Sequence, residues 1–511
     1  VGASTDTWGT KLNTDLDTVD GLFSSSGTSV AMNLDGAVID SSVIGGSTAA
    51  AGTFTTVVAA SLDISGDIDV DGTTNLDVVD VDGAVNFAAD VTFADGADII
   101  TASAGTSNFR AGVNAGNSIA SGGNQNTVIG DEAGTAITTG DENVFVGFQS
   151  GDALVDGTFN VAMGSNSLTT DTKGKKSVAI GTNALATQNF TSLTDTFNTA
   201  VGHSAGTSVT TGTNNTLIGG LSGDALTTGT HNVAVGYGSL STDTAGKFSV
   251  AVGGGALELQ NFTSATNAYN TGVGWLAGTA VTTGVQNTFI GGLAGEGTDN
   301  GNGNTAVGKG ALSANCSDNN TAVGISCMTV ATGTGNTGLG ANAGLNVSSG
   351  DNNIALGRDS LRTGAPGGAQ TTGDNKIGLG DSAITSAHIQ VDWTVASDAR
   401  DKTDFTALDL GLDFVKDLAP VTYKWDKRSK YGDKYADDYD LNAQTPDGTH
   451  KEDWLDIGFK AQEVEALEIA AGYDKDNKTN LISSHTDDGK QMGLQYSKFV
   501  PILVKAIQEQ N

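Results

Sequence analysis

The sequence predicts a mostly β, elongated fold of stacked short-strand repeats, a β-roll or β-solenoid with about 17 residues per rung, followed by a small α+β domain. Glycine supplies 72 of the 511 residues, while aromatic residues make up 6% of the chain. Glycines also recur at near-constant spacing, and the composition changes sharply near residue 390. A length of 511 residues would suit about three compact domains, but an apolar share of 38% argues against compact globules for most of the chain.

The repeat unit between residues 126 and 380 is Asn-x-x-x-Gly-x-x-(Ala/Ser)-(Gly/Leu), followed by a return rich in Thr and Gly. Each unit offers one short strand and then a glycine that can adopt positive φ at a corner. The Asn before the strand can bond to nearby backbone groups or stack on the Asn of the next rung. The closing glycines are Gly130, Gly147, Gly164, Gly181, Gly202, Gly219, Gly236, Gly253, Gly274, Gly291, Gly308, Gly324, Gly340 and Gly357.

Two of the units are four residues longer, which creates a superrepeat of 72 residues. These extensions, 189–197 and 261–269, carry four of the 11 aromatic residues of the array. In one interpretation the aromatics fill the core or a trimer seam, and in the other they form bumps that face a receptor. The first is favoured because buried aromatics outnumber exposed binding ones. The residues concerned are Phe190, Phe197, Phe262 and Tyr269.

A different kind of polypeptide begins near the junction Val395–Lys402. Residues 1–390 hold 65 of the 72 glycines and 10 of the 25 basic residues, and the last 121 residues hold the other 15 basic residues. The sequence therefore predicts that 391–511 is a small globular domain that follows the repeats of 118–390.

Four blocks in this C-terminal region resemble the self-cleaving intramolecular chaperone domain of phage tailspikes, tail fibres and endosialidases. Asp401 and Lys460 depart from the usual apolar residues of that family. The resemblance implies a homotrimer whose C-terminal domain brings three chain ends together. The blocks are Ser397–Lys402, Leu418–Trp425, Gly458–Val464 and Tyr496–Glu509.

The same resemblance implies that Ser397 is a nucleophile, that Lys402 is its base, and that the bond cut is Ala396–Ser397. A Ser–Lys pair can cleave a peptide when the lysine is neutral and within hydrogen-bond reach of the hydroxyl. A cationic neighbour such as Arg400 would favour the neutral lysine, whereas Asp401 would oppose it. Whether the domain is cleaved off or retained stays open.

The N-terminal part divides into two predicted regions. Residues 1–28 contain apolar residues at helical spacing, including Trp8, Leu12 and Leu16. This helix either caps the next element or forms a three-stranded helical neck near the virion-attachment end, since the segment loosely resembles N-terminal regions of phage tail proteins. Residues 29–117 alternate apolar and acidic residues, as in a β-rich shaft. Asp67–Gly72 mimics half of a calcium loop, but Val78 stands at the last ligand position, so strand alternation is the better explanation.

A formal net charge of −33 argues against binding to nucleic acid or to anionic lipid surfaces. Cys316 and Cys327 occupy non-equivalent repeat positions, and with five scattered histidines they indicate neither a disulfide framework nor a metal or cofactor site. No apolar run is long enough to span a membrane and no signal peptide is visible, as expected for a fibre assembled in the host cytoplasm and released by lysis.

These features favour a phage tail fibre or tailspike that sits in the virion, contacts tail or baseplate proteins through its N-terminal end, and binds a host-surface glycan or protein receptor. Its only expected enzymatic act is autoproteolysis by the Ser397–Lys402 pair. Two alternatives remain, a tailspike enzyme that degrades capsule polysaccharide and a bacterial surface adhesin. Detection of glycan hydrolysis would favour the first of these alternatives, and neighbouring genes that encode tail proteins would exclude the second.

Overall fold

The computed structural model describes residues 103–510 except 435, 437 and 478, together with residues 17, 85 and 101. The helical neck predicted for 1–28 and most of the shaft predicted for 29–117, including the calcium-loop mimic, therefore lie outside the described residues.

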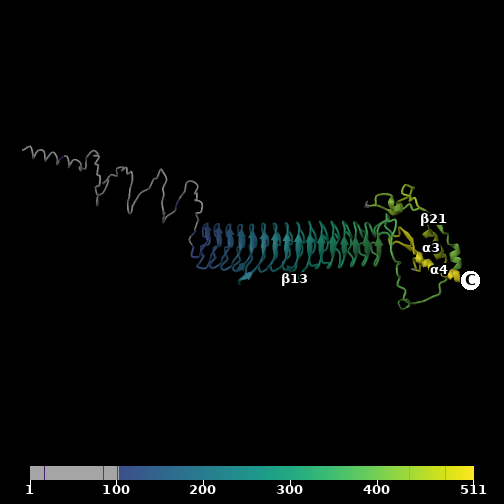
Figure 1. Cartoon of the computed structure of the whole chain (residues 1–511), viewed down its shortest axis with the longest axis horizontal. Coiled ribbons are helices and arrows are strands. Elements are labelled where there is room, and N and C mark those ends of the chain that lie inside the picture. Colours follow the sequence, from purple (N-terminus) through teal and green to yellow (C-terminus); the bar gives the residue numbers. More distant parts are fainter. Residues whose placement is uncertain are drawn as a thin grey trace, which may run out of the picture. The chain divides into compact units, whose positions relative to one another are not determined.

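The repeats form one parallel sheet of 16 short strands in which each strand pairs with the corresponding strand of the next rung. This sheet is one wall of a β-solenoid, so the predicted fold class is confirmed (Figure 1). The strands, in their order across the sheet, are β1 (Phe109–Ala111), β2 (Thr127–Ile129), β3 (Val144–Val146), β4 (Val161–Met163), β6 (Val178–Ile180), β8 (Thr199–Val201), β9 (Thr216–Ile218), β10 (Val233–Val235), β12 (Val250–Val252), β14 (Thr271–Val273), β15 (Thr288–Ile290), β16 (Thr305–Val307), β17 (Thr321–Val323), β18 (Thr337–Leu339), β19 (Ile354–Leu356) and β20 (Ile377–Leu379).

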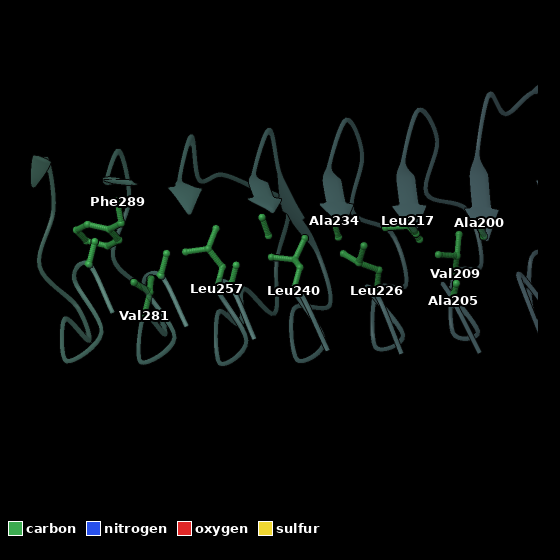
Figure 2. Packing of buried hydrophobic residues seen from close by; sticks show 14 of the residues in the cluster. Ala200, Ala205, Val209, Leu217, Leu226, Ala234, Leu240, Leu257, Val281 and Phe289 are labelled. Atoms are coloured by element: carbon green, nitrogen blue, oxygen red, sulfur yellow. The ribbon is translucent and has the colours of Figure 1, made fainter. Parts of the chain in front are cut away.

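From β2 onward, the middle residue of each strand of this sheet is buried inside the solenoid, where the side chains of the return segments pack against the strands. Leu217 and Phe289 come from strands, Leu226 and Val281 come from returns, and all four side chains are fully buried between the two walls (Figure 2). Eight of the 16 strands use Ala at this position, which leaves room for the larger side chains opposite. The apolar core is therefore one continuous column of small and medium side chains.

A buried ladder of asparagines fixes the register of the rungs. The Oδ1 of Asn143 accepts hydrogen bonds from the backbone N–H and the side-chain amide of Asn160, at 3.0 and 3.2 Å. The side-chain amide of Asn143 in turn donates to the carbonyl of Gly157 at 3.0 Å. Both predicted roles of this Asn, bonding to backbone and stacking on the next rung, are thus confirmed. The ladder starts one rung before the recognised repeats, because Asn108 accepts from Asn126 in the same way.

The corner glycines are required by their conformation and by close backbone approach. Gly236 has φ of +132°, and a Cβ built there would lie 2.6 Å from both the carbonyl carbon and the oxygen of Gly253 on the next rung. No side chain can be accommodated at that separation. The Gly spacing in the sequence is therefore the spacing of the rungs.

The two longer rungs insert a second, two-residue parallel ladder beside the main sheet. β5 (Gly174–Lys175) pairs with β7 (Thr194–Asp195), and β11 (Gly246–Lys247) pairs with β13 (Thr266–Asn267). Figure 1 shows β13 outside the main row of strands. The four extra residues are thus accommodated as a local side ladder, and the main sheet continues without a change of register.

The C-terminal domain combines short helices with two antiparallel strand pairs around a small core of Leu410, Phe414, Val464, Ile482, Phe499 and Ile502. Its elements are η1 (Ala399–Asp401), α2 (Leu412–Asp417), β21 (Val421–Tyr423), η2 (Arg428–Lys430), η3 (Leu441–Ala443), β22 (Asp456–Gly458), α3 (Ala461–Ala470), β23 (Ser483–His485), β24 (Met492–Leu494), η4 (Tyr496–Lys498) and α4 (Phe499–Gln510).

Candidate junction site and surfaces

The structure brings Ser397 and Lys402 together. The single 3-10 turn η1 lies between them, and Asp398 caps this turn by accepting a hydrogen bond from the backbone N–H of Arg400. As a result, Lys402 Nζ lies 2.6 Å from Ser397 Oγ and 3.4 Å from the Ser397 carbonyl oxygen. This is the reach that proton transfer from the hydroxyl to a neutral amine requires. The local geometry therefore allows the predicted nucleophile–base pair.

The charges around this pair are arranged differently from the sequence-based expectation. The guanidinium of Arg400 binds the carboxylate of Asp398 at 2.6 Å, and these hydrogen bonds hold the pKa of Asp398 below its usual value. Arg400 is thus engaged with an anion and does not act on Lys402 as an isolated cation. Ser397 and Lys402 are both exposed in the single chain.

A buried carboxylate that the sequence analysis missed organises the domain beyond the junction. Glu468, on α3, is fully buried and accepts hydrogen bonds from the backbone N–H groups of Leu481, Ile482 and Ser483, at 2.8, 2.6 and 2.9 Å. It therefore ties α3 to β23. A glutamate in a helical segment carries no local signal for such a role, because the three donors lie 13 to 15 residues later in the chain.

Helix α4 presents apolar side chains to solvent as well as to the core. Phe499 and Ile502 are buried, while Val500, Leu503 and Val504 are 59%, 45% and 51% exposed. An isolated small domain gains little from exposing such a helix face. Helix α4 therefore has one apolar face in the core of the domain and a second apolar face that is open to solvent in the single chain.

The outer face of the 16-stranded sheet carries a continuous aliphatic stripe, formed by the third residue of the strands from β2 to β20. Every one of these residues is aliphatic, and none of them is buried. Fourteen steps of about 4.8 Å between adjacent strands make the stripe roughly 67 Å long. The stripe consists of Ile129, Val146, Met163, Ile180, Val201, Ile218, Val235, Val252, Val273, Ile290, Val307, Val323, Leu339, Leu356 and Leu379.

The aromatic residues of the two extensions divide between the core and the surface. Phe190 and Phe262 are buried, at 8% and 7% exposure, whereas Phe197 and Tyr269 are 51% exposed. The exposed pair is covered on one ring face, since Lys176 lies 4.9 Å from the ring centre of Phe197 and Phe248 stacks on Tyr269 at 5.3 Å. Phe190 and Phe262 thus fill the core, while Phe197 and Tyr269 lie at the surface of the single chain, where both the trimer-seam and the receptor interpretation place them.

Other candidate chemistry is sparse in the described part of the chain. Cys316 and Cys327 are both buried and unpaired, and burial raises the pKa of the Cys327 thiol to about 12. Within the described residues, no group of three or more His, Cys, Asp or Glu side chains is placed to hold a metal ion. The described helices include none with the length and apolar character needed to cross a membrane.

Comparison with known proteins adds one match. Residues 397–473 match the family described as chaperone of endosialidase, a segment that starts at Ser397 and contains the first three of the four sequence blocks. Neither the curated proteins nor the solved structures include a match to this chain. A β-solenoid followed by such a domain is typical of tail fibres and tailspikes. The C-terminal part of this chain is therefore a domain of the chaperone-of-endosialidase family.

Proposed function

We propose that this protein is a homotrimeric phage tail fibre or tailspike that recognises the host surface and is assembled by its own C-terminal chaperone domain. The observation that carries the proposal is the order of the parts, a long solenoid followed directly by a chaperone-of-endosialidase domain. In this role the protein belongs to the virion, and its N-terminal end contacts tail or baseplate proteins.

The aliphatic stripe supports a trimer and suggests where the chains meet. Monomeric soluble proteins rarely expose a contiguous apolar patch of this extent. Because the stripe follows the solenoid rung by rung, three parallel chains in the same register would bury it continuously. We therefore assign it to the trimer seam, with the exposed face of α4 as a second contact in the C-terminal domain.

A chaperone domain solves a problem that the solenoid poses. A parallel trimer of repeats admits many shifted registers, and its non-local pairings make folding slow. A C-terminal domain that trimerises first would align the three chain ends and let the seam close from that end. Cleavage afterwards would make unfolding kinetically difficult, because the nucleating domain is gone.

The cleavage step uses the pair at the junction. Neutral Lys402 takes the proton of the Ser397 hydroxyl, and the oxygen attacks the carbonyl carbon of Ala396. The Ala396–Ser397 amide bond breaks as the nitrogen receives the proton, and water then hydrolyses the resulting ester. A lysine is neutral when its surroundings are dry or cationic. Since Lys402 is exposed in the single chain, we infer that neighbouring chains of the trimer supply the burial.

The oligomeric state tests the proposal. Light scattering on the Ser397→Ala protein, which keeps the whole chain, should give three times 51.4 kDa at micromolar concentration. A folded monomer of 51.4 kDa would contradict it. The paired variants Val235→Lys and Ile290→Lys place charges on the stripe and should reduce the trimer yield. Phe148→Lys, at an exposed position just past the corner glycine, provides the matched control.

A further inference from the structure

Tyr237 and Trp275 stand out among the exposed aromatic residues because they lie close together in one column of the solenoid, whereas Phe148 of the same column lies five rungs before Tyr237. Each follows a corner glycine, and they lie two rungs apart, after β10 and β14. Their exposed fractions are 70% and 61%, among the highest for aromatic residues of the solenoid. Two strand spacings of about 4.8 Å separate them by roughly 10 Å along the solenoid.

Glycines flank both rings within this column. The order over five successive rungs is Gly220, Tyr237, Gly254, Trp275 and Gly292. Each ring leans over the glycine before it, since a Cβ built on Gly220 would lie 3.6 Å from Tyr237 Cδ2 and one built on Gly254 would lie 3.7 Å from Trp275 Cδ1. On the following side, a Cβ on Gly292 would approach only the backbone oxygen of Trp275.

The other exposed aromatic column is built in the opposite way. There, His231 stacks on Phe248 at 5.1 Å and Phe248 stacks on Tyr269 at 5.3 Å, on consecutive rungs. Those rings cover one another's faces and leave mainly edges to solvent. In the Tyr237 column the intervening glycines prevent such mutual cover, so the ring faces stay available to a ligand.

The backbone that carries these rings is held rigidly. The N–H of Gly255 donates to the carbonyl of Tyr237 at 3.0 Å, and the N–H of Leu293 donates to the carbonyl of Trp275 at 2.9 Å. The backbone of both residues is thus bonded to the following rung, and little backbone entropy is lost when a ligand binds. Exposed polar side chains, His203 and Lys309, lie in the same column beyond the outer glycines.

We propose that Tyr237 and Trp275 form a binding platform for a neutral glycan chain, on which two pyranose rings of an extended segment stack. The C–H face of a pyranose is apolar, its hydroxyl edges remain in water, and aromatic faces are suited to such amphipathic partners. The net charge of −33 disfavours polyanionic polysaccharides. This inference rests on the proposed role in host recognition and names the ligand class and the residues.

Because the chain repeats every 72 residues, the residues found 72 positions earlier show which substitutions an equivalent rung accommodates. Ser165 and His203 stand at the positions equivalent to Tyr237 and Trp275, and Thr182 stands at the position of Gly254. The double variant Tyr237→Ser, Trp275→His therefore removes the tyrosine ring and replaces the indole with the smaller and more polar imidazole, while using residues that this solenoid already accommodates. Gly254→Thr keeps both rings but fills the space between them. The control variant, Phe248→Lys, alters the stacked column with the residue found at the equivalent Lys176.

The test measures binding of the full-length trimer to a panel of neutral hexasaccharides: gluco-, manno-, galacto- and xylo-oligosaccharides in α and β linkages. We expect at least one to bind, at least a tenfold loss of affinity in the double variant and in Gly254→Thr, and unchanged affinity in Phe248→Lys. The same proteins are then compared for adsorption to the bacterium that the parent phage infects, with trimer content checked by light scattering.

The outcomes separate this inference from the proposed function. If the wild type adsorbs to cells and the double variant adsorbs equally well, the platform is wrong while host recognition stands. If the wild type adsorbs to no host cell, the proposed function fails. Failure of the wild type to bind any of the neutral hexasaccharides overturns the ligand class, and loss of trimer in the double variant would show that the rings belong to the seam.

Discussion

At the residue scale, the solenoid depends on a few buried polar side chains whose hydrogen bonds connect neighbouring rungs. Asn215 is typical, since its Oδ1 accepts from the backbone N–H of Asn232 at 3.1 Å and its amide donates to the carbonyl of Gly229 at 2.9 Å. A buried polar group that loses its partner costs about 1–3 kcal/mol. Such side chains therefore contribute strongly to the stability of the solenoid and to the register between neighbouring rungs.

Asn215→Ala should lower the free energy of unfolding by about 1–3 kcal/mol for each group left without a partner. The groups concerned are the Asn232 N–H and the Gly229 carbonyl. Urea unfolding monitored by circular dichroism provides the measurement. Thr211→Ala, at an exposed position of the preceding return, is the matched control and should change stability by less than about 0.5 kcal/mol. Equal effects of the two variants would contradict the role of the ladder.

The two longer rungs replace the Asn ladder with another buried polar cluster. Ser177 stands where Asn is expected, and the side-chain amide of Gln188 bonds to both Ser177 Oγ and the Asp171 carboxylate, at 2.8 and 2.6 Å. Burial raises the pKa of Asp171, against the opposing effect of the Gln188 hydrogen bond. Asp243 repeats the arrangement in the second long rung, also with a pKa raised mainly by burial.

A raised pKa means that the folded state takes up a proton before the unfolded state does. As the pH falls from 7 through the folded pKa towards the ordinary value of 3.8, Asp171 and Asp243 should therefore contribute increasing stability. Thermal unfolding of the wild type and of the double variant Asp171→Asn, Asp243→Asn at pH 7 and pH 4.5 measures this. The melting temperature of the wild type should rise relative to the variant at the lower pH. A constant or reversed difference would show that the two carboxyls are not linked to folding in this way.

At the element scale, much of the fold could be predicted because each rung is specified locally. The Asn and Gly positions define the strand, the corner and the rung length, and these appear in the sequence at fixed spacing. The rung at Asn108 was not predicted, because its Asn lies 18 residues before Asn126 instead of the usual 17 and the repeat pattern is weaker in that segment. The hydrogen bonds of Glu468 to the backbone around the start of β23 could not be predicted, because they join residues distant in sequence. For the same reason, no local pattern reveals that Phe190 is buried while Phe197 is exposed.

The corner glycines lead to a prediction with an internal control. Gly236→Ala should destabilise the solenoid by at least about 2 kcal/mol, because residue 236 has a positive φ and its added Cβ would collide with the backbone of Gly253. Gly254, which directly follows the corner glycine of the next rung, does not have a left-handed φ. The Cβ of Gly254→Ala would have Trp275 Cδ1 as its nearest neighbour, at 3.7 Å. It should be tolerated. Urea midpoints of the two variants decide the matter, and similar midpoints would refute the backbone argument.

At the scale of the whole molecule, Ser397 stands at the start of the C-terminal family domain, which in the proposed function assembles the trimer and is then cleaved off. The sequence located both residues of the pair, because the family resemblance covers this stretch. Their 2.6 Å separation follows from the single turn η1 between them. What the sequence could not supply is the environment of the lysine. That environment depends on how far trimer formation buries a side chain that the single chain leaves exposed.

Autoproteolysis should therefore require Ser397, Lys402 and the trimer. The wild type should release a fragment beginning at Ser397, while Ser397→Ala and Lys402→Ala should each remain a single chain of about 51.4 kDa that still assembles, because folding needs the domain and not the cut. Lys402→Arg keeps the charge but no neutral base, so it should also stay uncut. A variant with charges on the α4 face, Val500→Lys with Val504→Lys, should cleave more slowly if the trimer buries the pair. Intact-mass analysis and N-terminal sequencing give the readout. A cut at another bond would refute the site, and cleavage in a demonstrably monomeric protein would refute the requirement for the trimer.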